Sequence, residues 1–145
     1  MKKYVFLLSL LTLTFASCEG PMGPPGDGVT RSIINFTVHE GDWKLVGRVN
    51  ELNSFYMYEF PAPEVTAFVC EKGNVFGYRW FDIDEQTPLG QVVHIGELIN
   101  GNEYLFTETY SFSFRPGYIT FYVDYSDFVT DIPPGTCDFR IVLNY

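Results

Sequence analysis

The sequence predicts an all-β protein, an antiparallel β-sandwich of the immunoglobulin-like or jelly-roll-like kind with about eight strands. From residue 31 onward, apolar and polar residues alternate along short segments, which is the period of a strand with one buried face. Turn residues separate these segments at roughly 8–12-residue intervals. Hydrophobic residues make up 46% of the chain, enough for one core, and residues 31–145 are therefore expected to form a single domain.

The expected strands follow one another from residue 34 to residue 144. Asn100-Gly101 is a strong hairpin signal, and Pro116-Gly117 predicts the next turn. Pro61 is expected to end the third strand, because proline cannot donate to a central ladder. The ranges are 34–38, 43–48, 55–60, 75–81, 91–99, 103–114, 118–125 and 138–144.

At most one short helix is expected, over residues 66–72. Thr66 could cap it, and Gly73 could end it in the left-handed conformation. Phe68, Val69 and Cys70 favour a strand instead. Both interpretations stay open at this point.

The first 17 residues have the order of a secretory signal. Lys2 and Lys3 form a short positive region, and an apolar run follows over residues 4–15. The run is too short to span a bilayer, which takes about 20 residues. Residues 1–17 are therefore expected to be a cleaved signal peptide.

The segment Phe15-Ala16-Ser17-Cys18 resembles the lipobox of bacterial lipoproteins. The resemblance implies cleavage before Cys18, a thioether-linked diacylglycerol on its sulfur and an acylated amine. Several acyl chains, at about 0.8 kcal/mol per buried CH2, would anchor the protein firmly. Glu19 follows, where an Asp would favour retention in the inner membrane, so the outer membrane is the expected location.

Residues 18–30 are expected to tether the domain to this anchor. Gly20 to Gly28 reads as consecutive Gly-x-y triplets, as in collagen. So short a run cannot hold a triple helix alone, and it predicts a stiff, extended tether; trimerisation is the alternative. With Cys18 and the acidic, aromatic β domain, this leader resembles a group of uncharacterised Gram-negative lipoproteins that carry a short collagen-like leader after the lipobox cysteine. The resemblance implies anchoring and an envelope location, but no activity.

Cys70 and Cys137 remain once Cys18 carries lipid. In an oxidising compartment this pair is expected either to form a disulfide or to stay as two separate thiols. A disulfide would close a loop of about 65 residues and restrict the unfolded chain. Two distant cysteines without a paired histidine do not have the spacing of a zinc site, and no cofactor is predicted.

The formal charge of -9 argues against nucleic acid as a partner, because an acidic surface repels phosphate. Asp82, Asp84 and Glu85 come closest to a calcium loop. They lack the glycine and the distal glutamate of such loops, so a solvated acidic loop is the preferred interpretation. The acidic residues at 124, 127 and 131 are interpreted in the same way.

Aromatic residues make up 18% of the chain, more than a small core needs. Tyr56 and Tyr58 share one face of an expected strand, and Tyr78 and Trp80 share a face of another. These four are the predicted ligand-contact residues, because exposed rings stack on sugars or contact other proteins. Alternatively, the rings fill the core.

The sequence contains no nucleophile elbow, zinc-protease motif or phosphate-binding glycine loop. Paired carboxylates can hydrolyse glycosides, but among 18 acidic residues such pairs arise by chance. The predicted function is a lipid-anchored, non-enzymatic binding module of the cell envelope or surface, with a glycan or an envelope protein as ligand. The alternatives are a periplasm-facing accessory protein that docks to another envelope protein, and a glycan-processing enzyme.

Overall fold

The computed structural model describes residues 28–82, 85–99 and 101–145. The predicted signal peptide, the predicted lipidation residue Cys18 and most of the predicted tether lie outside these residues.

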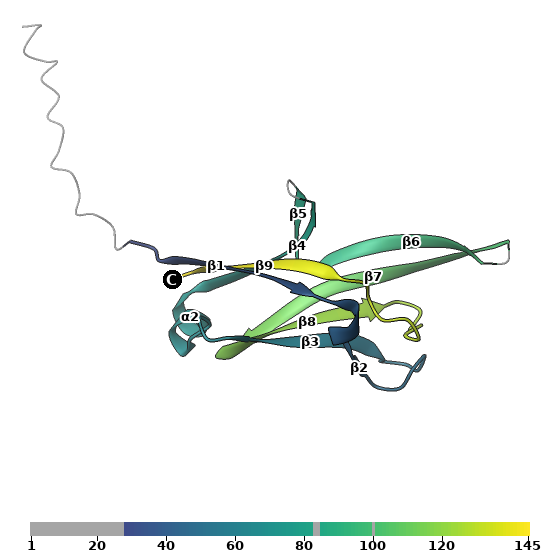
Figure 1. Cartoon of the computed structure of the whole chain (residues 1–145), viewed down its shortest axis with the longest axis horizontal. Coiled ribbons are helices and arrows are strands. Elements are labelled where there is room, and N and C mark those ends of the chain that lie inside the picture. The colour runs from purple at the N-terminus through teal and green to yellow at the C-terminus, as the bar shows by residue number, and fades with distance from the viewer. Residues whose placement is uncertain (1–27, 83–84, 100) are drawn as a thin grey trace, which may run out of the picture.

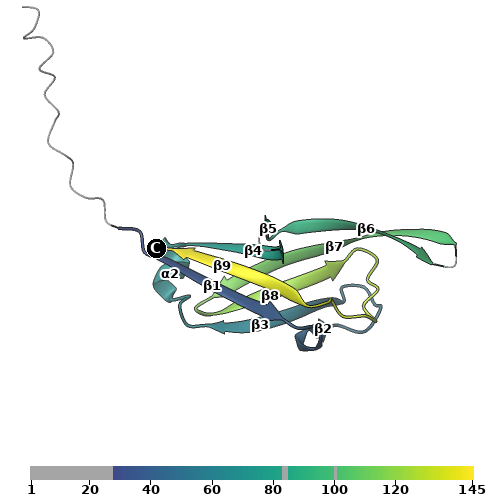
Figure 2. The same ribbon diagram turned by 45° about the horizontal axis from the view of Figure 1, so that its top comes forward.

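Two antiparallel sheets pack face to face, which confirms the predicted sandwich (Figure 1, Figure 2). The four-stranded sheet has the order β1 (Arg31–Val38), β9 (Cys137–Asn144), β4 (Asn74–Asp82), β5 (Glu85–Pro88). The five-stranded sheet has the order β2 (Lys44–Val46), β3 (Phe55–Ala62), β8 (Gly117–Tyr125), β7 (Asn102–Arg115), β6 (Gln91–Ile99). A 3-10 turn, η2 (Glu40–Asp42), joins β1 to β2.

The strand β5 is the element that the sequence did not indicate. It pairs with the end of β4, where Trp80 lies opposite Gln86 and Asp82 opposite Glu85. Pro88 is tolerated because β5 is the edge of its sheet. Residues 83 and 84, including the calcium candidate Asp84, lie outside the described residues.

The core is a stack of phenylalanine rings between the two sheets. Phe139 of β9 and Phe121 of β8 lie 4.3 Å apart between ring centroids, and both are almost fully buried. Phe36 of β1 stacks on Phe60 of β3 at 4.5 Å. Each pair joins one sheet to the other, and burying each ring contributes roughly 1.5–3 kcal/mol.

The segment that the sequence left open is the helix α2 (Ala67–Lys72). The Thr66 hydroxyl accepts the backbone N–H of Val69 at 3.2 Å, as an N-cap does. Gly73 is extended rather than left-handed (φ -90°), so that expectation was wrong. A glycine fits there because a Cβ would lie 2.8 Å from the Val69 carbonyl oxygen and 3.0 Å from that of Asn144.

Cys70 and Cys137 are free thiols, so of the two alternatives that the sequence left open the structure shows two separate thiols. Cys70 lies on α2, beside the end of β9 at Asn144, whereas Cys137 begins β9 at its other end. A strand rises about 3.3 Å per residue, so β9 separates these ends by about 23 Å. A disulfide needs Cα atoms within about 7 Å of each other.

The first and last described segments lie together. Thr30 and Tyr145 exchange two backbone hydrogen bonds, at 2.7 and 3.0 Å. The chain therefore enters the sandwich at the end where β9 finishes (Figure 1). Within the described ranges, no helix is long and apolar enough to cross a bilayer.

Candidate functional site

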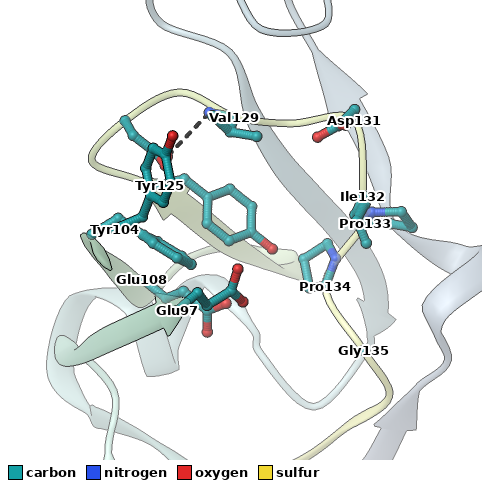
Figure 3. Close-up of a pocket in the computed structure, with 12 residues that line it drawn as sticks. Glu97, Tyr104, Glu108, Tyr125, Val129, Asp131, Ile132, Pro133, Pro134 and Gly135 are labelled. Carbon is teal, nitrogen blue, oxygen red and sulfur yellow. Dashed lines mark hydrogen bonds between the residues drawn. The ribbon is translucent and has the colours of Figure 1, made fainter. Parts of the chain in front are cut away.

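A cleft of about 450 Å³ opens at the end of the sandwich opposite the entry of the chain. One wall is the hairpin of β6 and β7, and the other is the segment 127–135 that connects β8 to β9. Figure 3 shows side chains from both walls converging on this space.

The hairpin wall exists because β7 is longer than its neighbours. Pairing of β7 with β8 starts only at Glu108 opposite Tyr125, so residues 102–107 of β7 pair with β6 alone. This part extends beyond the sandwich as an arm (Figure 1). Tyr104, Phe106 and Glu108 alternate along it and face the cleft, and Glu97 lies opposite Tyr104 on β6.

Tyr125 forms the floor of the cleft. Its side chain is mostly buried, and its ring packs against Phe106 and edge-on against Tyr56, each at 6.3 Å between centroids. The carboxylate of Glu108 accepts the hydroxyl hydrogen of Tyr110 at 2.8 Å. The carboxylates of Glu97 and Glu108 reach into the space in front of the Tyr125 hydroxyl (Figure 3).

The connecting segment is fixed through Thr130, which is buried. The backbone N–H of Thr130 donates to the Asn50 side-chain oxygen at 2.7 Å, and its hydroxyl accepts the Asn50 backbone N–H at 3.0 Å. The same hydroxyl donates to the Ser54 hydroxyl at 3.0 Å. The Tyr56 hydroxyl donates to the Thr130 carbonyl at 2.8 Å. These bonds hold the connecting segment in a defined position, although it pairs with no strand.

The far end of this wall is held in the same way. The indole N–H of Trp43 donates to the carbonyl oxygen of Gly135 at 3.2 Å. Pro133 and Pro134 precede that glycine and restrict the backbone further. Val129 and Ile132 point outward, with 49% and 71% of their surfaces exposed, and form an apolar rim. The cleft is therefore a preformed site with an exposed apolar rim.

The lining of the cleft is acidic. Glu97, Glu108, Asp127 and Asp131 contribute carboxylates, and among the described residues no lysine, arginine or histidine lines it. Asp127 is oriented by the backbone N–H of Val129, which donates to it at 3.1 Å (Figure 3). Burial raises the pKa of the Tyr125 hydroxyl, and the Glu108 carboxylate raises it further, so the phenol stays neutral.

Tyr56 and Tyr58, two of the predicted ligand-contact aromatics, face inward. Tyr56 lies beneath the cleft with 5% of its surface exposed, so its prediction as a contact residue was wrong. The face it occupies is covered by the opposite sheet, and its hydroxyl is satisfied internally. Tyr58 packs against Trp43 at 6.5 Å. The other two, Tyr78 and Trp80, lie on the outer face of the four-stranded sheet, away from the cleft.

The carboxylates do not assemble into a metal site. Across the residues that the structure describes, no three His, Cys, Asp or Glu side chains are placed to hold one ion. The calcium candidates Asp82 and Glu85 pair as backbone neighbours across the β4–β5 hairpin. Dispersed negative charge beside aromatic rings suits an organic cation better than a metal ion, because an ammonium or guanidinium group is attracted to both.

The sequence does not reveal this site, because its carboxylates come from separate segments. From the sequence, Asp127 and Asp131 are predicted to belong to a solvated acidic stretch. The available signal was the length of the segment 103–114, which exceeds that of its partner strand. The part of a hairpin that extends beyond its sheet has a face that no opposite sheet covers. Here that face lies beside the segment 127–135.

Comparisons with known proteins found no relative of this chain. No protein-family model, no curated protein and no solved structure matches it.

Proposed function

We propose that this protein is a lipid-anchored, non-enzymatic binding module of the cell envelope, and that its acidic cleft captures a basic, partly apolar segment of a partner protein. The observation that carries the proposal is the preformed cleft in which Glu97, Glu108, Asp127 and Asp131 surround the aromatic floor. A site that is already ordered before binding loses little entropy on binding.

The chemistry of the lining fits a lysine or arginine side chain. Its charged end would lie among the carboxylates, where attraction between opposite charges at about 4 Å is strong near a protein surface. Its aliphatic stem would lie along Tyr104 and the rim of Val129 and Ile132, as long basic side chains commonly do on apolar surfaces. The overall charge of -9 would speed the approach of a basic partner.

The position of the cleft supports anchored presentation. The cleft is at the end of the sandwich away from Thr30, where the tether would join (Figure 1). With lipid on Cys18 and an extended Gly/Pro segment between, the cleft would face away from the membrane. This orientation would suit docking to another envelope protein on the periplasmic side. It would equally suit capture of a ligand at the cell surface.

The cleft can be tested with peptides of opposite charge. The full-length chain in detergent is titrated into fluorescently labelled Lys-Leu-Lys-Leu-Lys and Glu-Leu-Glu-Leu-Glu, and anisotropy is measured at low and high salt. We expect the basic peptide alone to bind, more weakly as salt rises, because salt screens exposed charges. Combining Glu97→Gln with Asp131→Asn should weaken binding about tenfold or more.

The matched control combines Glu64→Gln with Glu71→Gln, which removes the same two charges from exposed residues outside the cleft. It should leave the affinity for the basic peptide unchanged. Equal binding of both peptides, or equal losses in the control and the cleft variant, would show that the cleft is not the site.

The anchor and its orientation are tested separately. Metabolic labelling with an alkyne fatty acid should mark the wild-type protein and not Cys18→Ser. Protease treatment of intact cells then distinguishes the two settings: cleavage of the domain, with a periplasmic control protein intact, means surface display. Resistance until the outer membrane is broken means that the domain faces the periplasm, which favours an envelope-protein partner.

A further inference from the structure

The outer face of the four-stranded sheet carries an ordered row of side chains. Antiparallel register places Thr37 of β1 opposite Asp138 of β9, Asp138 opposite Trp80 of β4, and Trp80 opposite Gln86 of β5. Neighbouring strands lie about 4.8 Å apart, so this row is about 14 Å long. An aromatic ring thus lies between a carboxylate and an amide.

A second row runs beside the first. Asn35 lies opposite Arg140, Arg140 opposite Tyr78, and Tyr78 opposite Pro88. The Thr37 hydroxyl donates to the Asp138 carboxylate and fixes its orientation. Hydrogen-bonding groups of both kinds therefore surround two aromatic rings that are only half-buried.

The surface is hollowed beside the first row. A groove of about 340 Å³ is lined by Asn35, Thr37, Asp138 and Trp80, together with Phe36 and Phe139. Ligand sites usually have volumes of about 300–1,000 Å³ and combine an apolar surface with a few directed polar groups. The groove has that composition.

Two buried donors at this place have no partner. The indole N–H of Trp80 and the Nε–H of Arg140 are shielded from solvent, yet neither has a hydrogen-bond acceptor among the described residues. The guanidinium carbon of Arg140 lies 6.0 Å from the Trp80 ring centroid, and its Nη1 donates to Gln86 at 3.1 Å. Buried donors without an acceptor are rare in folded proteins.

We propose that this groove binds a neutral pyranose ring of a glycan. A sugar ring presents C–H bonds on one face, which pack on an aromatic surface such as Trp80. Its hydroxyls both donate and accept, and the groove offers acceptors in Asp138, Asn35 and the Thr37 hydroxyl oxygen, and a donor in the Asn35 amide. The site is separate from the acidic cleft and does not depend on the function proposed for it.

The charge of the groove selects against acidic sugars. Asp138 is one of the two inner residues of its row, and the whole chain carries -9. A uronate or sulfated sugar would have to place its charge beside this carboxylate, whereas a neutral hydroxyl can donate to it. Neutral hexoses, pentoses and N-acetylated hexoses remain as ligands.

The two tryptophans of the chain provide a direct readout. Trp43 is buried in the core with 6% of its surface exposed, whereas Trp80 lines the groove. The full-length chain is applied to an array of neutral and anionic oligosaccharides, and each neutral hit is titrated while intrinsic fluorescence is followed. Binding should change the emission of Trp80, and Trp80→Phe should abolish that change while keeping the emission of Trp43.

Affinity is then compared across variants. Trp80→Ala should weaken binding of the neutral oligosaccharide about tenfold or more, and Asp138→Asn should weaken it by a smaller factor. Tyr118→Ala is the matched control, because it removes a partly exposed aromatic ring from the other sheet. It should leave binding unchanged, and circular dichroism should show that all variants are folded.

Absence of binding to every neutral oligosaccharide on the array would overturn the proposal. So would binding that Trp80→Ala leaves intact, or a preference for anionic sugars. Peptide capture by the acidic cleft would survive each of these outcomes, so the two proposals fail independently.

Discussion

The hydroxyl of Tyr56 donates to the carbonyl oxygen of Thr130 at 2.8 Å, across 74 positions of the chain. This bond links the third strand of the chain to the loop that forms one wall of the acidic cleft. Asp131, the next residue along that loop, raises the pKa of Tyr56, although burial raises it more. The core and the candidate site are therefore parts of one hydrogen-bonded unit.

Tyr56→Phe tests this connection. The change removes the hydroxyl and leaves the buried Thr130 carbonyl without that donor, so we expect a loss of about 1–2 kcal/mol in the free energy of unfolding. A decrease of about 3–8 °C in Tm should follow in thermal denaturation. Tyr118→Phe, at an exposed position, is the control and should not change Tm. Equal Tm values for both variants would mean that the bond contributes nothing to stability.

Gly77 is expected to tolerate no side chain. A Cβ on this residue would lie 2.7 Å from Cδ1 of Leu89 and 2.8 Å from Cε1 of Phe112, a ring that packs on Phe121 and cannot move freely. Gly77→Ala should therefore cost about 1–3 kcal/mol in chemical denaturation. Gly41→Ala is the matched control, because a Cβ there would meet nothing within 4 Å. A Gly77→Ala protein as stable as this control would contradict the close packing.

The cysteines should behave as two independent thiols. A reductant should leave Tm unchanged, because no bond joins Cys70 to Cys137. In the native protein an alkylating reagent should label Cys70 first, since Cys137 is buried and burial raises the pKa of its thiol. Peptide mass spectrometry after timed alkylation measures both rates. A cross-linked peptide that contains Cys70 and Cys137 would refute the expectation.

Alkaline pH should destabilise the fold. Burial is the main reason that the pKa values of Tyr110 and Tyr125 lie above their ordinary value of 10.0; the cation of Arg79 partly opposes this for Tyr110. Above pH 10 the unfolded chain releases these protons while the native state keeps them, so the free energy of unfolding falls as pH rises. Their contribution is fully present below pH 10.

Urea denaturation between pH 8 and 11 measures this dependence. Tyr125→Phe should flatten the decline of stability above about pH 10, because one of the responsible protons is gone. Tyr104→Phe, at a tyrosine that is half exposed, should leave the decline as in the wild type. Identical curves for all three proteins would show that Tyr125 does not cause the loss of stability at alkaline pH.

Local sequence signals predict most of the strands, though not β5, and most of the turns between them. Alternation with a period of two predicts the inner residues of β1, including Phe36. The pair Asn100-Gly101 predicts the β6–β7 hairpin. Local signals suffice for these features because strand period and turn geometry depend on neighbouring residues. The helix α2 stayed ambiguous, since its cap and its β-favouring residues gave opposite indications within a few positions.

Which face each strand buries, and which side chains meet at its ends, depends on how the two sheets pack together. Tyr56 and Trp80 have the same alternating context, yet one is core and the other faces a groove, because alternation defines two faces without saying which one the opposite sheet covers. Pro61 lies inside β3 rather than ending it, because β2 pairs only with residues 55–57 and leaves the rest of that edge free. The acidic cleft likewise arises from carboxylates on separate segments, and only the packing of the whole chain brings them together.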